Sequence, residues 1–75
     1  MDKKISILGS TGSIGVQALE VAKLRGFDVI ALTAHKNTAL LEAQIRAFKP
    51  VMAAMTDERA AAALKISVGD TPTKV

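Results

Sequence analysis

The stretch ILGSTGSIG, residues 7–15, places three glycines at three-residue spacing directly after a short run rich in β-branched residues. This run, Lys3–Leu8, predicts a buried strand that ends at a glycine. From Ser13 to about Arg25 the apolar spacing becomes that of a helix, and Gly26 supplies a stop signal. The apolar positions that recur at helical spacing are Ile14, Ala18, Val21 and Ala22. The first 26 residues therefore predict a strand, a glycine-rich turn and a helix.

A second strand and helix are predicted downstream of this unit. The segment Asp28–Ala34 is apolar on both of its faces, as expected for the central strand of a parallel sheet. Asn37 or Thr38 can cap a helix, which Pro50 ends. The apolar side chains of this helix stand at i, i+4 and i+7, at Leu41, Ile45 and Phe48. The spacing predicts one apolar face that packs on the sheet.

A third strand and helix complete the pattern. Residues Val51–Met55 predict the strand, and Thr56 and Asp57 are candidate caps for the helix after it. The alanine-rich run 60–64 is strongly helix-forming. Residues 66–75 carry turn signals and predict a loop that leads towards another strand.

This alternation predicts an α/β fold, the N-terminal βαβαβα half of a Rossmann-type doubly wound parallel sheet in three layers. The expected spatial order of the strands is 3-2-1. In a complete fold of this type strand 1 is central, whereas in this chain it would be an edge. We therefore expect residues 1–75 to form a partial nucleotide-binding domain, the N-terminal piece of a longer protein.

Composition narrows the classes of function. The net charge is only +3, the basic residues are spread along the chain, and the aromatics are limited to Phe27 and Phe48, so we expect no nucleic-acid partner. The absence of cysteine excludes a disulfide framework and a thiolate metal site. No signal peptide or membrane-spanning run is present, so we expect a cytoplasmic protein without a membrane partner. The sequence offers no carboxylate cluster, no Ser-His-Asp set and no metal-ligand spacing, so we assign no catalytic or metal-binding residue.

The glycine-rich turn matches the dinucleotide fingerprint G-x-G-x-x-G imperfectly, because Ser10 stands where the first glycine is expected. Gly12 would allow a pyrophosphate to approach closely, and Gly15 would allow close packing of the helix on the strand. The hydroxyls of Ser10, Thr11 and Ser13 can bond phosphate oxygens. No acidic residue lies between positions 2 and 20, so the positive end of the helix dipole is left for an external anion. The alternative is a purely structural strand–helix turn.

The end of the second predicted strand indicates which cofactor would bind. NAD-preferring sites place an acid here for the ribose 2′-hydroxyl, but this chain has His35, Lys36 and Asn37. A cation at Lys36 suits a 2′-phosphate, so the expected cofactor is NADP(H). The alternative for Lys36 is a solvated loop lysine. His35 could stack on the adenine, bond the phosphate or face water.

The segments ISILGSTGSIGVQALEV and VIALTAHKNTALLEAQIRAFKP resemble the N-terminal part of 1-deoxy-D-xylulose 5-phosphate reductoisomerases. The resemblance implies that NADPH contacts Thr11, Gly12, Ser13 and Ile14, and that residues 35–37 close on its 2′-phosphate end. Many members of that family carry glycine where this chain has His35, so a side-chain contact could replace a backbone contact there.

The same resemblance implies an activity for the parent protein. The family rearranges 1-deoxy-D-xylulose 5-phosphate, a phosphosugar, and reduces the product with NADPH to 2-C-methyl-D-erythritol 4-phosphate in non-mevalonate isoprenoid biosynthesis. A divalent cation (Mg²⁺, Mn²⁺ or Co²⁺) holds the substrate, and family members are homodimers. The metal and substrate residues would lie beyond residue 75, so the resemblance implies that this chain alone is inactive.

Two alternatives remain open at this point. The first is another NADP-dependent reductase, of the semialdehyde dehydrogenase or extended short-chain type, which shares the T-G-x-x-G element. The second is a non-catalytic nucleotide-binding fragment.

Overall fold

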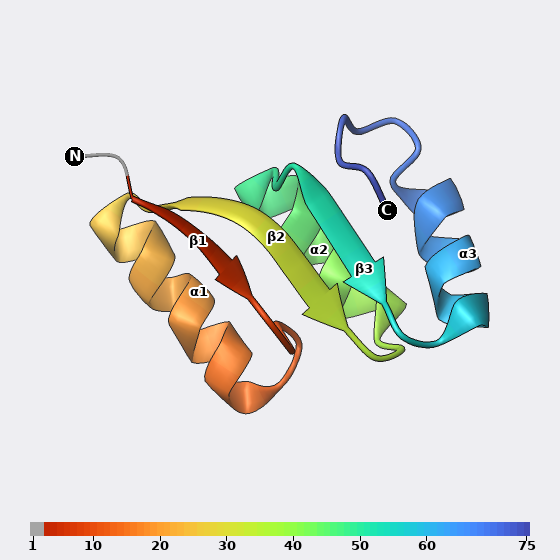
Figure 1. Cartoon of the computed structure of the whole chain (residues 1–75), viewed down its shortest axis with the longest axis horizontal. Coiled ribbons are helices and arrows are strands. Elements are labelled where there is room, and N and C mark those ends of the chain that lie inside the picture. The colour runs from red at the N-terminus through yellow and green to blue at the C-terminus, as the bar shows by residue number, and fades with distance from the viewer. Residues whose placement is uncertain (1–2) are drawn as a thin grey trace.

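The computed structural model describes residues 3–75 and contains three strands and three helices in strict alternation (Figure 1). The elements are β1 (Lys4–Ile7), α1 (Ser13–Arg25), β2 (Asp28–Ala34), α2 (Thr38–Phe48), β3 (Met52–Met55) and α3 (Glu58–Ser67). The predicted order of elements is therefore confirmed.

The strands form one parallel sheet in the order β1-β2-β3, with β2 in the middle. In its central row Ile7 is aligned with Leu32, and Leu32 with Ala53. This arrangement confirms the predicted 3-2-1 order and leaves β1 at one edge. Beyond β3, Lys74 forms a parallel bridge to Met52, so the C-terminal segment begins to extend the sheet at the other edge.

The core lies between the sheet and the helices. Buried side chains from all three strands and all three helices form one cluster, with Leu32, Leu41 and Leu64 fully buried. A single cluster places α1, α2 and α3 on the same face of the sheet, and α2 lies behind β2 and β3 in Figure 1. The described chain thus supplies two layers of the doubly wound fold.

Helix α1 buries only part of its apolar surface against the core. Ile14 is 81% exposed and Val21 is 50% exposed, whereas Gly15, Leu19 and Ala22 are buried. Of the apolar positions at helical spacing, Ala22 therefore faces the core, whereas Ile14 and Val21 do not. The rotation of the helix is set by Gly15, which packs against the preceding loop, and this contact turns Ile14 outward.

The helix ends agree with the predicted caps. The side chain of Asn37 accepts a hydrogen bond from the Leu40 amide at the start of α2, and that of Asp57 accepts one from the Ala60 amide at the start of α3. None of the helices in the described residues has the length and apolar character needed to cross a membrane.

Candidate functional site

The glycine-rich loop between β1 and α1 has a tightly folded backbone. Gly9 adopts a positive φ of 71°, which favours glycine, and its carbonyl accepts a hydrogen bond of 3.1 Å from the Gly12 amide. A Cβ at Gly15 would lie 2.2 Å from the Gly9 oxygen and 2.6 Å from the Ser10 Cα. Gly15 is closely packed, but its partner is the backbone of the loop and not the strand that was expected.

The amino end of α1 presents free backbone donors to solvent. Gly12 is the N-cap and has no side chain to cap the helix, and the first turn holds no acidic residue. Gly12, Ser13 and Ile14 are all exposed. Together with the helix dipole, these first-turn amides can bind an anion.

An open groove of about 420 Å³ lies over this end of the helix. It is lined by Ile7, Leu8, Gly9, Gly12, Ser13, Ile14, Gly15 and Ala18. Four of the predicted cofactor residues (Gly12, Ser13, Ile14 and Gly15) therefore share one concave surface. Thr11, which precedes them, is partly exposed.

Ser10 differs from the other two hydroxyl residues of the loop, Thr11 and Ser13, because it is fully buried. Its amide donates to the Thr33 carbonyl at 2.8 Å, and its hydroxyl donates to the same carbonyl at 3.3 Å. Its own carbonyl accepts a 2.8 Å hydrogen bond from Nε2 of Gln44. All three polar groups of Ser10 are engaged inside the protein, so its hydroxyl shapes the loop and does not face the groove.

The second predicted segment, residues 35–37, follows β2. Because the strands are parallel, it lies at their carboxyl ends, as the glycine-rich loop does. His35, Lys36 and Asn37 are exposed. Nδ1 of His35 lies 2.6 Å from the hydroxyl of Thr56, which links the ends of β2 and β3. Asn37 directs its side-chain oxygen at the Leu40 amide, so its side chain serves as a helix cap.

Two residues at this edge were missed by the sequence reasoning. The hydroxyl of Thr33 accepts a 3.0 Å hydrogen bond from the Gly9 amide, and the side chain of Gln44 donates a hydrogen bond to the Ser10 carbonyl. A signal for Gln44 was available, because it follows Leu41 by three residues and therefore lies on the apolar face of α2. A polar residue at such a position needs a buried partner.

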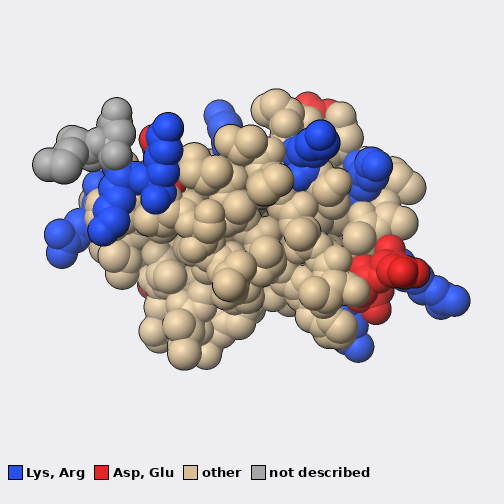
Figure 2. All heavy atoms as spheres, in the orientation of Figure 1, with Lys and Arg blue, Asp and Glu red and all other residues tan. Residues whose placement is uncertain are grey.

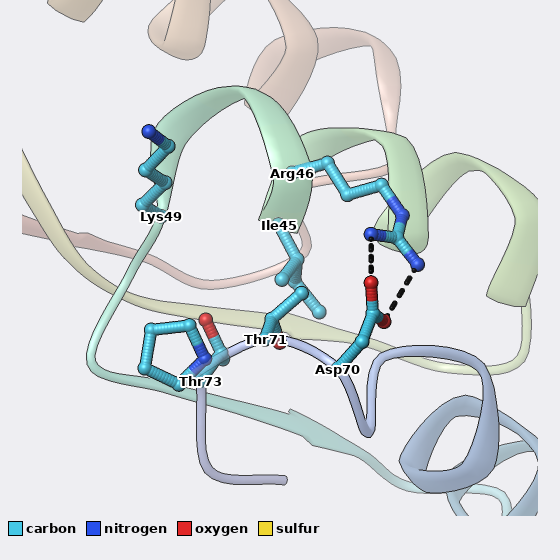
Figure 3. Close-up of a pocket in the computed structure, with 7 residues that line it drawn as sticks. Ile45, Arg46, Lys49, Asp70, Thr71 and Thr73 are labelled. Atoms are coloured by element: carbon cyan, nitrogen blue, oxygen red, sulfur yellow. Dashed lines mark hydrogen bonds and ion pairs between the residues drawn. The ribbon is translucent and has the colours of Figure 1, made fainter.

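A second hollow, of about 240 Å³, lies near the amino end of β3 (Figure 3). There Arg46 donates two hydrogen bonds of 3.0 Å to the Asp70 carboxylate and one of 3.2 Å to Glu42. The Arg46 hydrogen bonds lower the pKa of Asp70, and the bonds to Asp70 and Glu42 raise the pKa of Arg46. The guanidinium is thus already engaged by carboxylates, so this hollow is held together by internal ion pairs.

The charged side chains form no continuous stripe on the face seen in Figure 2: its centre is uncharged, Lys and Arg lie at the left, top and right, and acidic side chains gather at the right. Within residues 3–75, no group of three or more His, Asp or Glu side chains is placed to hold a metal ion.

The sequence of the chain matches known proteins along its whole length. The family model of 1-deoxy-D-xylulose 5-phosphate reductoisomerase matches residues 5–75. The reductoisomerase of Acetivibrio thermocellus is 51% identical over 75 residues, and that of Agathobacter rectalis is 49% identical over 74. These matches cover 100% and 97% of this chain but 20% of each relative, so the chain spans about a fifth of their length.

Solved structures give the same result. The Zymomonas mobilis reductoisomerase in complex with NADPH superposes on 99% of this chain with a TM-score of 0.91 at 28% identity, over 20% of its own length. A reductoisomerase in complex with NADPH, fosmidomycin and magnesium covers 96% of this chain, over 18% of its own length, with a TM-score of 0.88 at 29% identity. The family match decides against the other NADP-dependent reductases, and the chain belongs to the 1-deoxy-D-xylulose 5-phosphate reductoisomerase family.

Proposed function

We propose that this chain is the NADPH-binding N-terminal portion of a 1-deoxy-D-xylulose 5-phosphate reductoisomerase. The observation that carries the proposal is the groove at the amino end of α1, where glycine residues line the surface and the first backbone amides of the helix are uncapped. The chain that carries this groove belongs to the reductoisomerase family. Gly12 lines this groove, and the absence of a side chain there leaves its backbone open to a ligand. The residues present therefore fit a pyrophosphate.

Each part of the site has a role in this proposal. The amides of Ser13, Ile14 and Gly15 bind the pyrophosphate, and the hydroxyls of Thr11 and Ser13 add donors. Gly12 provides the close approach. Ser10 supports the loop from inside the protein, where its hydrogen bonds are already made. When bound, NADPH supplies the hydride for the reduction.

The segment that follows β2 confers the preference for NADPH over NADH. Lys36 is exposed at the edge of the sheet that carries the glycine-rich loop, and no carboxylate stands with it in residues 35–37. A lysine attracts the 2′-phosphate, whereas a carboxylate would repel it. His35, held by Thr56, adds an imidazole edge beside the same position.

The remaining features of the parent enzyme extend the proposal beyond this chain. We place its substrate, 1-deoxy-D-xylulose 5-phosphate, and its divalent cation on later parts of a longer polypeptide. The enzyme would work as a homodimer in the cytoplasm, without a membrane or nucleic-acid partner, and this segment alone would have no activity. The complex of a relative with NADPH, fosmidomycin and magnesium supports the pairing of cofactor and metal.

The cofactor preference provides the test. In the full-length protein, Lys36→Ala should weaken NADPH binding about tenfold, because it removes one charge-assisted contact, and should leave NADH binding within about twofold. Lys65→Ala, an exposed lysine on α3, is the matched control and should change neither dissociation constant. Titration by fluorescence or calorimetry measures both nucleotides. Equal losses for NADPH and NADH would remove the 2′-phosphate assignment.

A further inference from the structure

A buried glutamine on α2 donates a hydrogen bond to the buried side of the glycine-rich loop. Gln44 is only 7% exposed, and its Nε2 donates a 2.8 Å hydrogen bond to the Ser10 carbonyl, across 34 positions of sequence. The acceptor is fully buried as well. Because a buried hydrogen bond has no competing water, this contact ties the loop to α2.

The orientation of the Gln44 amide is fixed by this bond. Its other polar atom, Oε1, is buried and has no hydrogen-bond partner in the described part of the chain. A flipped amide would place Oε1 against the Ser10 carbonyl, which is also an acceptor, so only one orientation works. A polar side chain left half satisfied in the core costs stability, and an apolar residue would avoid that cost. The contribution that a glutamine makes at this position must therefore come from its hydrogen bond to the Ser10 carbonyl.

Gln44 completes the set of bonds that fixes the position of the loop. Thr33 on β2 binds Gly9 and the amide and hydroxyl of Ser10, but it leaves the Ser10 carbonyl to Gln44. That carbonyl belongs to the peptide that leads to Thr11 and then to the start of α1. Gly15, in the first turn of α1, packs directly on the same Ser10 backbone. A displacement of Ser10 would therefore move the amides that face the groove.

We propose that Gln44 is a positioning residue for the cofactor: it fixes Ser10, and through Ser10 it sets the direction of the first-turn amides of α1. The inference rests on the proposed NADPH function. Gln44 touches no cofactor itself. It acts on the glycine-rich loop, which would contact the pyrophosphate that NADPH and NADH have in common. Loss of Gln44 should therefore weaken the binding of both nucleotides, whereas loss of Lys36 should weaken the binding of NADPH alone.

The test compares Gln44→Leu with Ile45→Val in the full-length protein. Leucine is close to glutamine in size but donates no hydrogen bond, whereas Ile45→Val loosens the same helix and leaves the loop bond intact. Hydrogen exchange of a peptide covering residues 5–15 should become about tenfold faster in Gln44→Leu. NADPH and NADH should lose affinity by the same factor, about threefold to tenfold. Ile45→Val should stay within about twofold of wild type in both measurements.

A third variant separates positioning from general packing. In Gln44→Glu the buried carboxyl can donate to the Ser10 carbonyl only while it is protonated. Loop protection relative to wild type should therefore recover as the pH falls from about 8 to about 5, since burial raises the pKa of a carboxyl. A variant that acted only through packing would show no such recovery.

The outcomes separate this inference from the proposed function. If the wild-type protein binds NADPH and Gln44→Leu binds it equally well, the positioning role is overturned while the NADPH function stands. The role is also overturned if Ile45→Val reproduces both losses. If the wild-type protein binds no NADPH, the proposed function itself fails.

Discussion

Replacement of Gly15 by alanine should damage both the fold and the cofactor site. The new Cβ would lie 2.2 Å from the Gly9 oxygen, whereas ordinary contact begins at 3.4 Å. The atoms in the way are backbone atoms of Gly9 and Ser10, which cannot rotate aside. Overpacking of this kind costs about 1–3 kcal/mol, and the better helix propensity of alanine offsets up to about 1 kcal/mol. Because the clash is with backbone, we expect the free energy of local opening to fall by about 2 kcal/mol. The equilibrium constant for opening of this region would then rise about 30-fold.

The matched control is Gly12→Ala, three residues earlier in the same loop. Its Cβ would lie 3.5 Å from the Gly9 oxygen, which is ordinary contact, so its effect on stability should stay below about 1 kcal/mol. It should nevertheless weaken NADPH binding, since Gly12 lines the groove proposed for the cofactor. Native-state hydrogen exchange of residues 5–25 and NADPH titration measure the two effects. A Gly15→Ala protein that is as protected as wild type would refute the reasoning from close packing.

Three further predictions concern the scaffold. Asn37→Ala should cost α2 about 1 kcal/mol in exchange protection, and Asn37→Ser should restore most of it, because serine also caps helices. Leu32→Ala should cost about 2–5 kcal/mol in denaturant unfolding, since Leu32 is fully buried at the centre of the sheet. Arg46 lowers the pKa of Asp70 below its ordinary value of 3.8, so folding favours the charged carboxylate. This contribution is present above pH 3.8 and is lost as the pH falls through the lower folded-state pKa. The difference in exchange protection of residues 66–75 between wild type and Asp70→Asn should therefore shrink as the pH falls from about 6 to about 3.

Most of the fold could be predicted from local signals. The strand Asp28–Ala34 and the start of α1 at Ser13 agree with the structure residue by residue, because Gly12 precedes the helix and Gly26 separates it from the strand. The rotation of α1 could not be predicted in the same way. Large apolar residues such as Ile14 and Leu24 lie on its exposed side, so hydrophobic spacing does not define a single face. The face is decided by the contact of Gly15 with the loop, which is a tertiary effect.

The location of the candidate site could be predicted from the sequence, but the hydrogen bonds that hold its loop from inside the protein could not. Parallel strands bring the ends of β1 and β2 to one edge, so the glycine-rich loop and residues 35–37 were expected together. A sequence does not reveal which serine of a loop turns inward. Ser10 and Ser13 stand three positions apart, and only the fold shows that the first is buried and the second exposed.

The hydrogen bonds of the glycine-rich loop also constrain when that loop can take shape. Its bonds to Thr33 span 23 and 24 residues, and its bond to Gln44 spans 34. The Gly12–Gly9 turn is local, and it cannot orient the loop relative to the sheet. During synthesis, β1 and α1 therefore leave the ribosome before the partners of their loop exist. The groove proposed for the nucleotide can assemble only after α2 has emerged and docked, which makes it a late product of folding although it lies near the start of the chain.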